Sequence, residues 1–150
     1  MHDADADGRD VVRPVVIDSP KRLLLLIPSA STGEFRWTLP RFPMRPGETS
    51  RRAAARHLHR VADLPALRIS PLIGRLPRVN AVEGLQYVVV VRTVVESWPT
   101  SVGSAVGPEA RWWSMAELRS AKALVEPVQL LDFMDGYWDG WLPDGEISLD

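Results

Sequence analysis

The residues of this chain that could do chemistry are concentrated at positions 39–64, LPRFPMRPGETSRRAAARHLHRVADL. Basic side chains dominate the segment. Arginine presents five N–H donors in a planar fork that matches phosphate or carboxylate, and histidine can add another donor. This composition predicts a site for an anion such as phosphate, with the candidate contacts Arg41, Arg52, Arg56, His57 and Arg60.

The spacing of the segment resembles the Nudix box. In that family signature Gly is followed after five residues by Glu, and after seven more by Arg-Glu-U-x-Glu-Glu-x-Gly-U, where U is bulky and aliphatic. Glu48 and Arg56 match the first Glu and the Arg, and Leu58 and Leu64 match the two aliphatic positions. The preceding Trp-Thr-Leu-Pro at 37–40 also fits the usual surroundings of the box.

The same alignment shows that the acidic positions of the signature are substituted. Three glutamates are replaced by His57, Arg60 and Val61, and Phe42 and Asp63 stand at the two glycine positions. The resemblance implies hydrolysis of nucleoside diphosphates linked to another group, with Mg²⁺ or Mn²⁺ held by the box glutamates. Such hard cations require oxygen ligands, which neither arginine nor valine supplies. We therefore expect no metal site and no cofactor, with Glu48 as the remaining box carboxylate.

A second segment extends the resemblance toward the C-terminus. Residues 111–118, RWWSMAEL, are similar to a late Trp-x-x-x-Glu-Leu element of the family, where a strand passes into a helix. The likeness therefore covers roughly residues 11–140 and implies an α/β (α+β) fold, a mixed β-sheet packed between helices. Trp98, Trp112 and Trp113 are candidates either for stacking on a base or for the core.

Local patterns predict the individual elements of this fold. Residues 1–10 are expected to form an acidic flexible tail, and residues 11–150 a single domain. The β-branched and leucine-rich runs predict strands at 11–17, 22–27, 35–39, 69–76, 85–95 and 110–113. Thr49 is a natural N-cap for a helix over 50–62, with Ala54, Ala55, Leu58 and Ala62 as its apolar stripe. Residues 97–108 are expected to be a loop, and 115–124 and 127–141 helices.

Composition excludes several classes of protein. The chain has 150 residues, no cysteine and no apolar run long enough to span a membrane, so we expect a cytoplasmic protein. The net charge of −1 is unevenly distributed, because residues 33–78 carry ten Arg against three acids, and residues 126–150 carry seven acids and no Lys or Arg. No basic arm is present, which makes nucleic acid an unlikely partner.

Three functions of different classes remain compatible with the sequence. The first is a catalytically inactive Nudix-fold protein that binds a nucleotide or another phosphorylated ligand through the Arg-rich box. The second is an atypical metal-dependent diphosphohydrolase, with Mg²⁺ held by Glu48 and by acids outside the box such as Glu34, Glu83 or Glu117. The third is an interaction scaffold that binds a protein partner or a second copy of itself and takes no small molecule.

Overall fold

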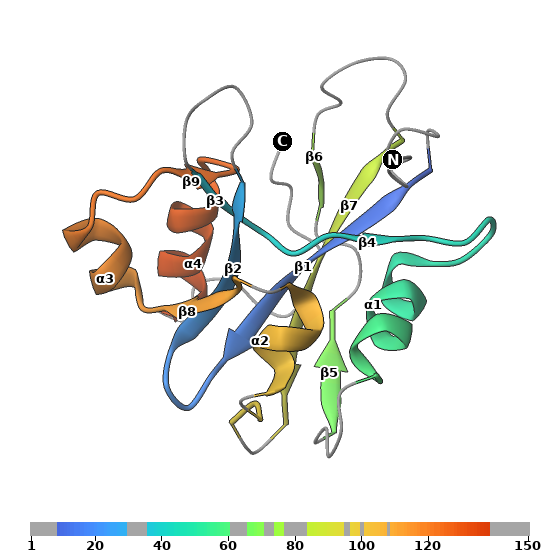
Figure 1. The fold of residues 1–150 in the computed structure, drawn as a ribbon, viewed down its shortest axis with the longest axis horizontal. Coiled ribbons are helices and arrows are strands. Elements are labelled where there is room, and N and C mark those ends of the chain that lie inside the picture. Colours follow the sequence, from blue (N-terminus) through green and yellow to red (C-terminus); the bar gives the residue numbers. More distant parts are fainter. Residues whose placement is uncertain are drawn as a thin grey trace.

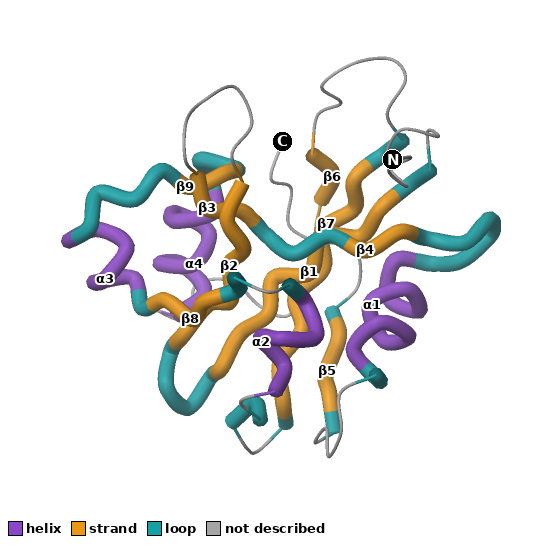
Figure 2. The backbone as a smooth tube through the Cα atoms, viewed as in Figure 1, coloured by secondary structure: helices purple, strands orange, loops and turns teal. Residues whose placement is uncertain are grey.

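A mixed β-sheet with helices on both faces forms the body of the molecule, as the sequence predicts (Figures 1 and 2). The computed structural model describes residues 9–29, 36–60, 66–70, 74–76, 84–94, 97–99, 101–107 and 109–138. In these ranges no helix is long and apolar enough to cross a membrane.

Two long parallel strands lie at the centre of the sheet. β1 (Val11–Asp18) pairs with β7 (Gln86–Thr93) along a register that joins Val11 to Gln86 and Ile17 to Arg92. The path across the sheet runs β5-β7-β1-β2-β3-β9. The other strands on this path are β5 (Leu67–Ile69), β2 (Leu23–Ser29), β3 (Arg36–Thr38) and β9 (Val125–Glu126). Shorter strands pair off this path, β4 (Phe42–Pro43) with β1, β6 (Gly74–Leu76) with β7 and β8 (Arg111–Trp113) with β2.

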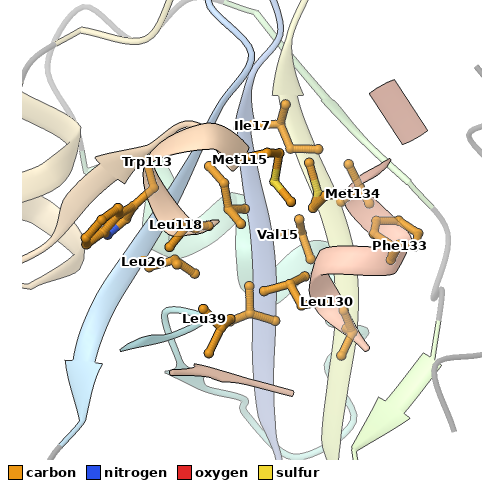
Figure 3. Close-up of a cluster of buried hydrophobic side chains, with 14 residues drawn as sticks. Val15, Ile17, Leu26, Leu39, Trp113, Met115, Leu118, Leu130, Phe133 and Met134 are labelled. Carbon is orange, nitrogen blue, oxygen red and sulfur yellow. The ribbon is translucent and has the colours of Figure 1, made fainter. Parts of the chain in front are cut away.

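Both faces of the central strands are buried, because successive side chains point to opposite sides of a strand. Val15 and Ile17 of β1 face one hydrophobic cluster, in which α3 (Met115–Ser120) and α4 (Leu130–Trp138) pack on the sheet. Figure 3 shows Leu118, Leu130, Phe133 and Met134 of these helices converging on the β1 side chains.

The opposite face carries the second hydrophobic cluster. Val12 and Val16 of β1 face α1 (Ser50–Leu58) and α2 (Ser101–Val106) there. The leucine-rich strand β2 is shared between the two clusters, since Leu24 and Leu26 lie in the first and Leu25 in the second. This division explains why the run of leucines is a strand that is buried on both sides.

Several predicted boundaries are wrong, and tertiary pairing accounts for the differences. The strand expected at 69–76 is two strands, β5 and β6, which pair with separate parts of β7. The expected loop at 97–108 contains α2, because Val102 fits into the second cluster. The helix expected at 115–124 ends at Ser120, and the chain turns at Lys122 (φ 50°) into β9, a strand that the sequence did not predict.

Of the two remaining helices, α1 ends earlier than the sequence predicts and α4 begins later. α1 ends at Leu58 rather than at residue 62, and His59 and Arg60 form a turn; residues 61–65 lie outside the described ranges. Its buried residues are Ala53, Ala54 and Leu58, so Ala55 does not belong to the stripe that contacts the sheet. α4 begins at Leu130, after β9, and its expected end at residue 141 is not described.

The N-terminal segment joins the domain at Asp10. Its carboxylate accepts a hydrogen bond from the Leu85 backbone N–H (2.9 Å), and its carbonyl accepts one from Met44 N–H (2.9 Å). Residues 1–8 of the expected tail lie outside the described ranges. Gly84 belongs to this junction, because a Cβ there would meet the Arg9 carbonyl oxygen at 2.4 Å.

A buried arginine ties the central strands to the segment that enters the box. Arg13 of β1 is 6% exposed, and its guanidinium donates to the Gln86 side chain (2.7 Å) and to the Thr38 hydroxyl (2.7 Å). It also donates to the carbonyls of Leu39 (2.7 Å) and Pro40 (3.2 Å). The guanidinium therefore fixes residues 38–40, which lead directly into β4.

Replacing this arginine should strongly destabilise the fold. Arg13→Met preserves much of the volume but leaves four acceptors without their donor in a buried place, so we expect unfolding to become easier by about 3 kcal/mol or more. Chemical denaturation measures this loss. Arg51→Met, at an exposed helix position, is the matched control and should change stability by about 0.5 kcal/mol or less. Equal effects of the two variants would contradict the role of Arg13.

Candidate functional site

The candidate site is organised by the turn that leads into α1. Pro46-Gly47 makes this turn, and Gly47 has a φ of +76°, a backbone conformation that glycine adopts at little cost. Thr49 caps the helix, accepting a hydrogen bond from the Arg52 N–H (3.2 Å). The turn and cap place Glu48 just before the helix, with its side chain 11% exposed.

The carboxylate of Glu48 forms an ion pair with an arginine. Arg56 donates from Nε to Glu48 Oε2 (2.8 Å) and from Nη2 to Glu48 Oε1 (2.9 Å), a two-point ion pair. Oε1 also accepts the Arg45 backbone N–H (2.9 Å). The Arg56 guanidinium is the main reason that the pKa of Glu48 is lowered to about 2, from an ordinary value of 4.5. Arg56 thus neutralises this carboxylate and uses a lone pair on each of its two oxygens.

His57 packs against the segment that precedes α1. Its imidazole stacks on Phe42, with ring centroids 4.6 Å apart and planes inclined by 12°. Nε2 lies 3.0 Å from the Pro43 carbonyl oxygen, which also accepts from Arg56 Nη2 (3.2 Å). Burial is the main cause that lowers the pKa of His57. The two substituted box positions, 42 and 57, thus contact each other.

The remaining predicted ligand residues do not gather at one point. Arg60 is exposed in the turn after α1, and it makes no ion pair with the described residues. Arg41 is half-buried between β3 and β4 and is engaged in interactions of its own. Val61 and Asp63 lie outside the described ranges.

Arg52 lies on a different side of α1, at an open cavity of about 610 Å³ between this helix and β5. The cavity is lined by Thr49, Arg51, Arg52, Ala55, His59, Ala66, Leu67 and Ile69. Helical spacing explains the contribution of α1, because Arg52, Ala55 and His59 are three and four residues apart and share one face. The sequence alone indicates that arginines lie on this helix. It does not indicate the apolar residues of β5 that complete the cavity, because these reach the helix only through the packing of β5 beside α1.

The acids proposed as metal ligands outside the box do not join Glu48 within the described residues. Glu117 completes the capping box of α3, where its carboxylate accepts the Ser114 N–H (2.9 Å). Glu34 and Glu83 fall outside those ranges. Among the residues that the structure describes, no three His, Asp or Glu side chains are grouped so that they could hold a metal ion.

The three tryptophans that the sequence offers for stacking or for the core differ in their burial. Trp98 and Trp113 are 5% and 4% exposed and belong to the core, and Trp98 Nε1 donates to the Ile17 carbonyl (2.8 Å). Trp112 is partly buried against the second hydrophobic cluster. Trp98 and Trp113 are therefore core residues rather than a platform for a base.

Comparison with solved structures places the fold. The chain is similar to a NUDIX hydrolase from Nitrosomonas europaea, at 18% identity and a TM-score of 0.54, with 89% of this chain and 90% of that chain covered. An ADP compounds hydrolase is 20% identical, with a TM-score of 0.56 and coverage of 89% and 75%. The C-terminal domain of mouse MUTYH, from its complex with human PCNA, is 20% identical, with a TM-score of 0.58 and coverage of 89% and 89%.

These likenesses establish a Nudix-like fold over most of the chain. No protein-family model and no curated protein matches the sequence. At this level of identity the shared architecture carries no activity with it, because one fold supports many functions. The function has to be argued from the site itself.

The Glu48–Arg56 pair should make the free energy of unfolding depend on pH in the acidic range. The pKa of Glu48 is lower in the folded protein than its ordinary value, so the pair stabilises the fold above about pH 4.5, and this contribution disappears as the pH falls toward about 2. Glu48→Gln should lower the free energy of unfolding by about 1–2 kcal/mol at neutral pH. The difference between wild type and variant should shrink below pH 4.5.

Urea denaturation over this pH range measures the effect. Glu109→Gln changes an exposed acid of the same type and is the control, with an expected change of about 0.5 kcal/mol or less. A Glu48→Gln loss that stays constant down to acidic pH would show that the ion pair does not lower the carboxyl pKa.

Proposed function

We propose that this protein binds a phosphorylated small molecule through the cations of α1, without a metal ion and without hydrolysing the ligand. The observation that carries the proposal is the two-point pair between Glu48 and Arg56. It occupies the box carboxylate with a guanidinium. Metal-assisted phosphoryl chemistry needs a cation to neutralise the phosphate and to activate water. The substituted positions 57 and 60 provide an imidazole and a guanidinium in its place.

The charge around α1 supports binding of an anion. Arg51, Arg52 and Arg60 lie exposed along the helix and its final turn, and none of them is paired with an acid of the described residues. Arg56, by contrast, is neutralised by Glu48. Guanidinium groups without partners attract phosphate, and several around one helix reinforce each other at low ionic strength. Phosphate contacts at Arg41 and His57 remain part of this proposal, although both side chains are packed against the protein.

Metal independence tests this function directly. Calorimetric titration with ADP should give the same dissociation constant in chelator and in Mg²⁺, and affinity should fall as ionic strength rises toward physiological values. No AMP should be released from ADP-ribose in the presence of Mg²⁺ or Mn²⁺. Glu48→Gln should not weaken ADP binding by more than about twofold, because this carboxylate repels phosphate rather than contacting it.

Two results would overturn the proposal in different directions. Turnover that requires Mg²⁺ and disappears in Glu48→Gln would establish the diphosphohydrolase, with the ion displacing Arg56. Failure of ADP, AMP and pyrophosphate to bind or to raise the melting temperature would remove the small molecule altogether, since any ligand of the native state stabilises it by mass action.

The second candidate function is an interaction scaffold. One specific observation favours it, because the structurally similar MUTYH domain is named in a complex with another protein, human PCNA. It is distinguished from the first by the absence of any stabilisation by phosphorylated probes.

A further inference from the structure

We propose that the open cavity between α1 and β5 is a binding site for an alkyl phosphate or alkyl diphosphate. Its rim would hold the anionic head and its wall the aliphatic body. This inference rests on the proposed function in one respect, that the ligand is phosphorylated. It goes further in placing that ligand away from the box positions and in naming the chemistry of the body.

The rim of the cavity is cationic. Its charge comes from Arg51 and Arg52, and His59 and Thr49 also line the cavity. Both arginine side chains are exposed and neither makes an ion pair in the described part of the chain. Two backbone amides of the first turn of α1 are already used, since Arg52 N–H donates to Thr49 Oγ1 and Ala53 N–H to the Thr49 carbonyl. The exposed arginine side chains are free to close around an anion, with their guanidinium forks matching phosphate oxygens.

The wall of the cavity is aliphatic. Ala55 contributes from α1, and Ala66, Leu67 and Ile69 contribute from β5 and the residue before it. No Phe, Tyr or Trp is among the described lining residues, so a nucleobase would find no such ring to stack on. An alkyl chain gains from burial against such a wall in proportion to the area it removes from water.

The size of the cavity agrees with this occupant. About 610 Å³ lies within the range of small-molecule sites, and it exceeds what a phosphate group alone would fill. A lone anion on this rim would leave the apolar wall exposed to water. An amphipathic anion uses both features at once, which is why the cavity favours it over inorganic phosphate.

The box positions 56, 57 and 60 can be compared with the cavity as alternative places for the ligand. Arg60 is a cation on the same helix segment that does not line the cavity, and its neighbours Arg56 and His57 are bound to Glu48 and to the Pro43 carbonyl. A ligand that used the box positions would depend on Arg60. A ligand in the cavity would depend on Arg52 and on the open space above Ala55.

Calorimetric titrations in chelator, with pyrophosphate, ADP and dimethylallyl diphosphate, test the assignment. Dimethylallyl diphosphate should bind more tightly than pyrophosphate and ADP. Arg52→Gln should weaken its binding about tenfold or more, because it removes charged hydrogen bonds to the head. Ala55→Phe, which places a ring in the cavity beside the aliphatic wall and leaves the charge unchanged, should abolish the advantage over pyrophosphate. Arg60→Gln distinguishes the box positions from the cavity, and Arg119→Gln, at an exposed position of α3, is the charge control that should change affinity by about twofold or less.

The possible failures are separable. If pyrophosphate or ADP binds without metal and Arg60→Gln, but not Arg52→Gln, removes the binding, the cavity assignment is overturned while the proposed function stands. If dimethylallyl diphosphate binds no better than pyrophosphate, or Ala55→Phe leaves its advantage intact, the aliphatic body is overturned. If none of the three probes binds, both proposals fall. Circular dichroism and melting temperature confirm that each variant is folded, and Ala55→Leu offers a smaller filling where Ala55→Phe does not fold.

Discussion

The buried guanidinium of Arg13 is the constraint on which the arrangement of the sheet and the box depends. It bridges β7 through Gln86 and the chain segment 38–40 through a hydroxyl and two carbonyls. The network continues outward, because the Thr38 hydroxyl donates to the Glu126 carbonyl (3.1 Å) in β9. Desolvating an arginine costs several kcal/mol, so the cost is offset only if these acceptors are all in place together. That requirement fixes where the chain leaves β3, and hence where β4 offers the Pro43 carbonyl to the box helix.

The features that the sequence predicted are those set by local patterns. The β-branched run at 11–17 and the four leucines predicted β1 and β2, and Thr49 predicted the start of α1, because strand propensity and helix capping depend on neighbouring residues. The features it missed depend on distant partners. α2 forms within a Ser-, Pro- and Gly-rich stretch because Val102 reaches the second cluster, and β9 is a strand of two residues that exists by pairing with β3. The break between β5 and β6 likewise reflects separate pairing sites on β7.

The same distinction applies to the candidate site. Spacing matched Glu48, Arg56 and His57 to positions of one box. In the structure Arg56 contacts both Glu48 and the Pro43 carbonyl, and His57 contacts the same carbonyl. Spacing could not show that the charge of Arg56 is neutralised by an ion pair with Glu48. Nor could it show that Arg51 and Arg52 lie beside the apolar residues of β5. The availability of a charge depends on its partners in space, so a count of arginines overstates the cationic strength of the box face. The cavity becomes visible only when the helix and the strand are placed side by side.

Replacing a metal-binding glutamate by arginine changes which parts of phosphoryl chemistry remain possible. A divalent ion in such a site neutralises the phosphate and also lowers the pKa of a bound water to make a nucleophile. A guanidinium can do the first, with two parallel hydrogen bonds to phosphate oxygens, but it has no open coordination position and no lone pair. His57 could serve as a base in principle, yet its ring is stacked on Phe42 and directed at a carbonyl. Arg and His in place of acids therefore keep an attraction for phosphate but hold no ion that could activate water. This is the physical reason that supports the proposed recognition without hydrolysis.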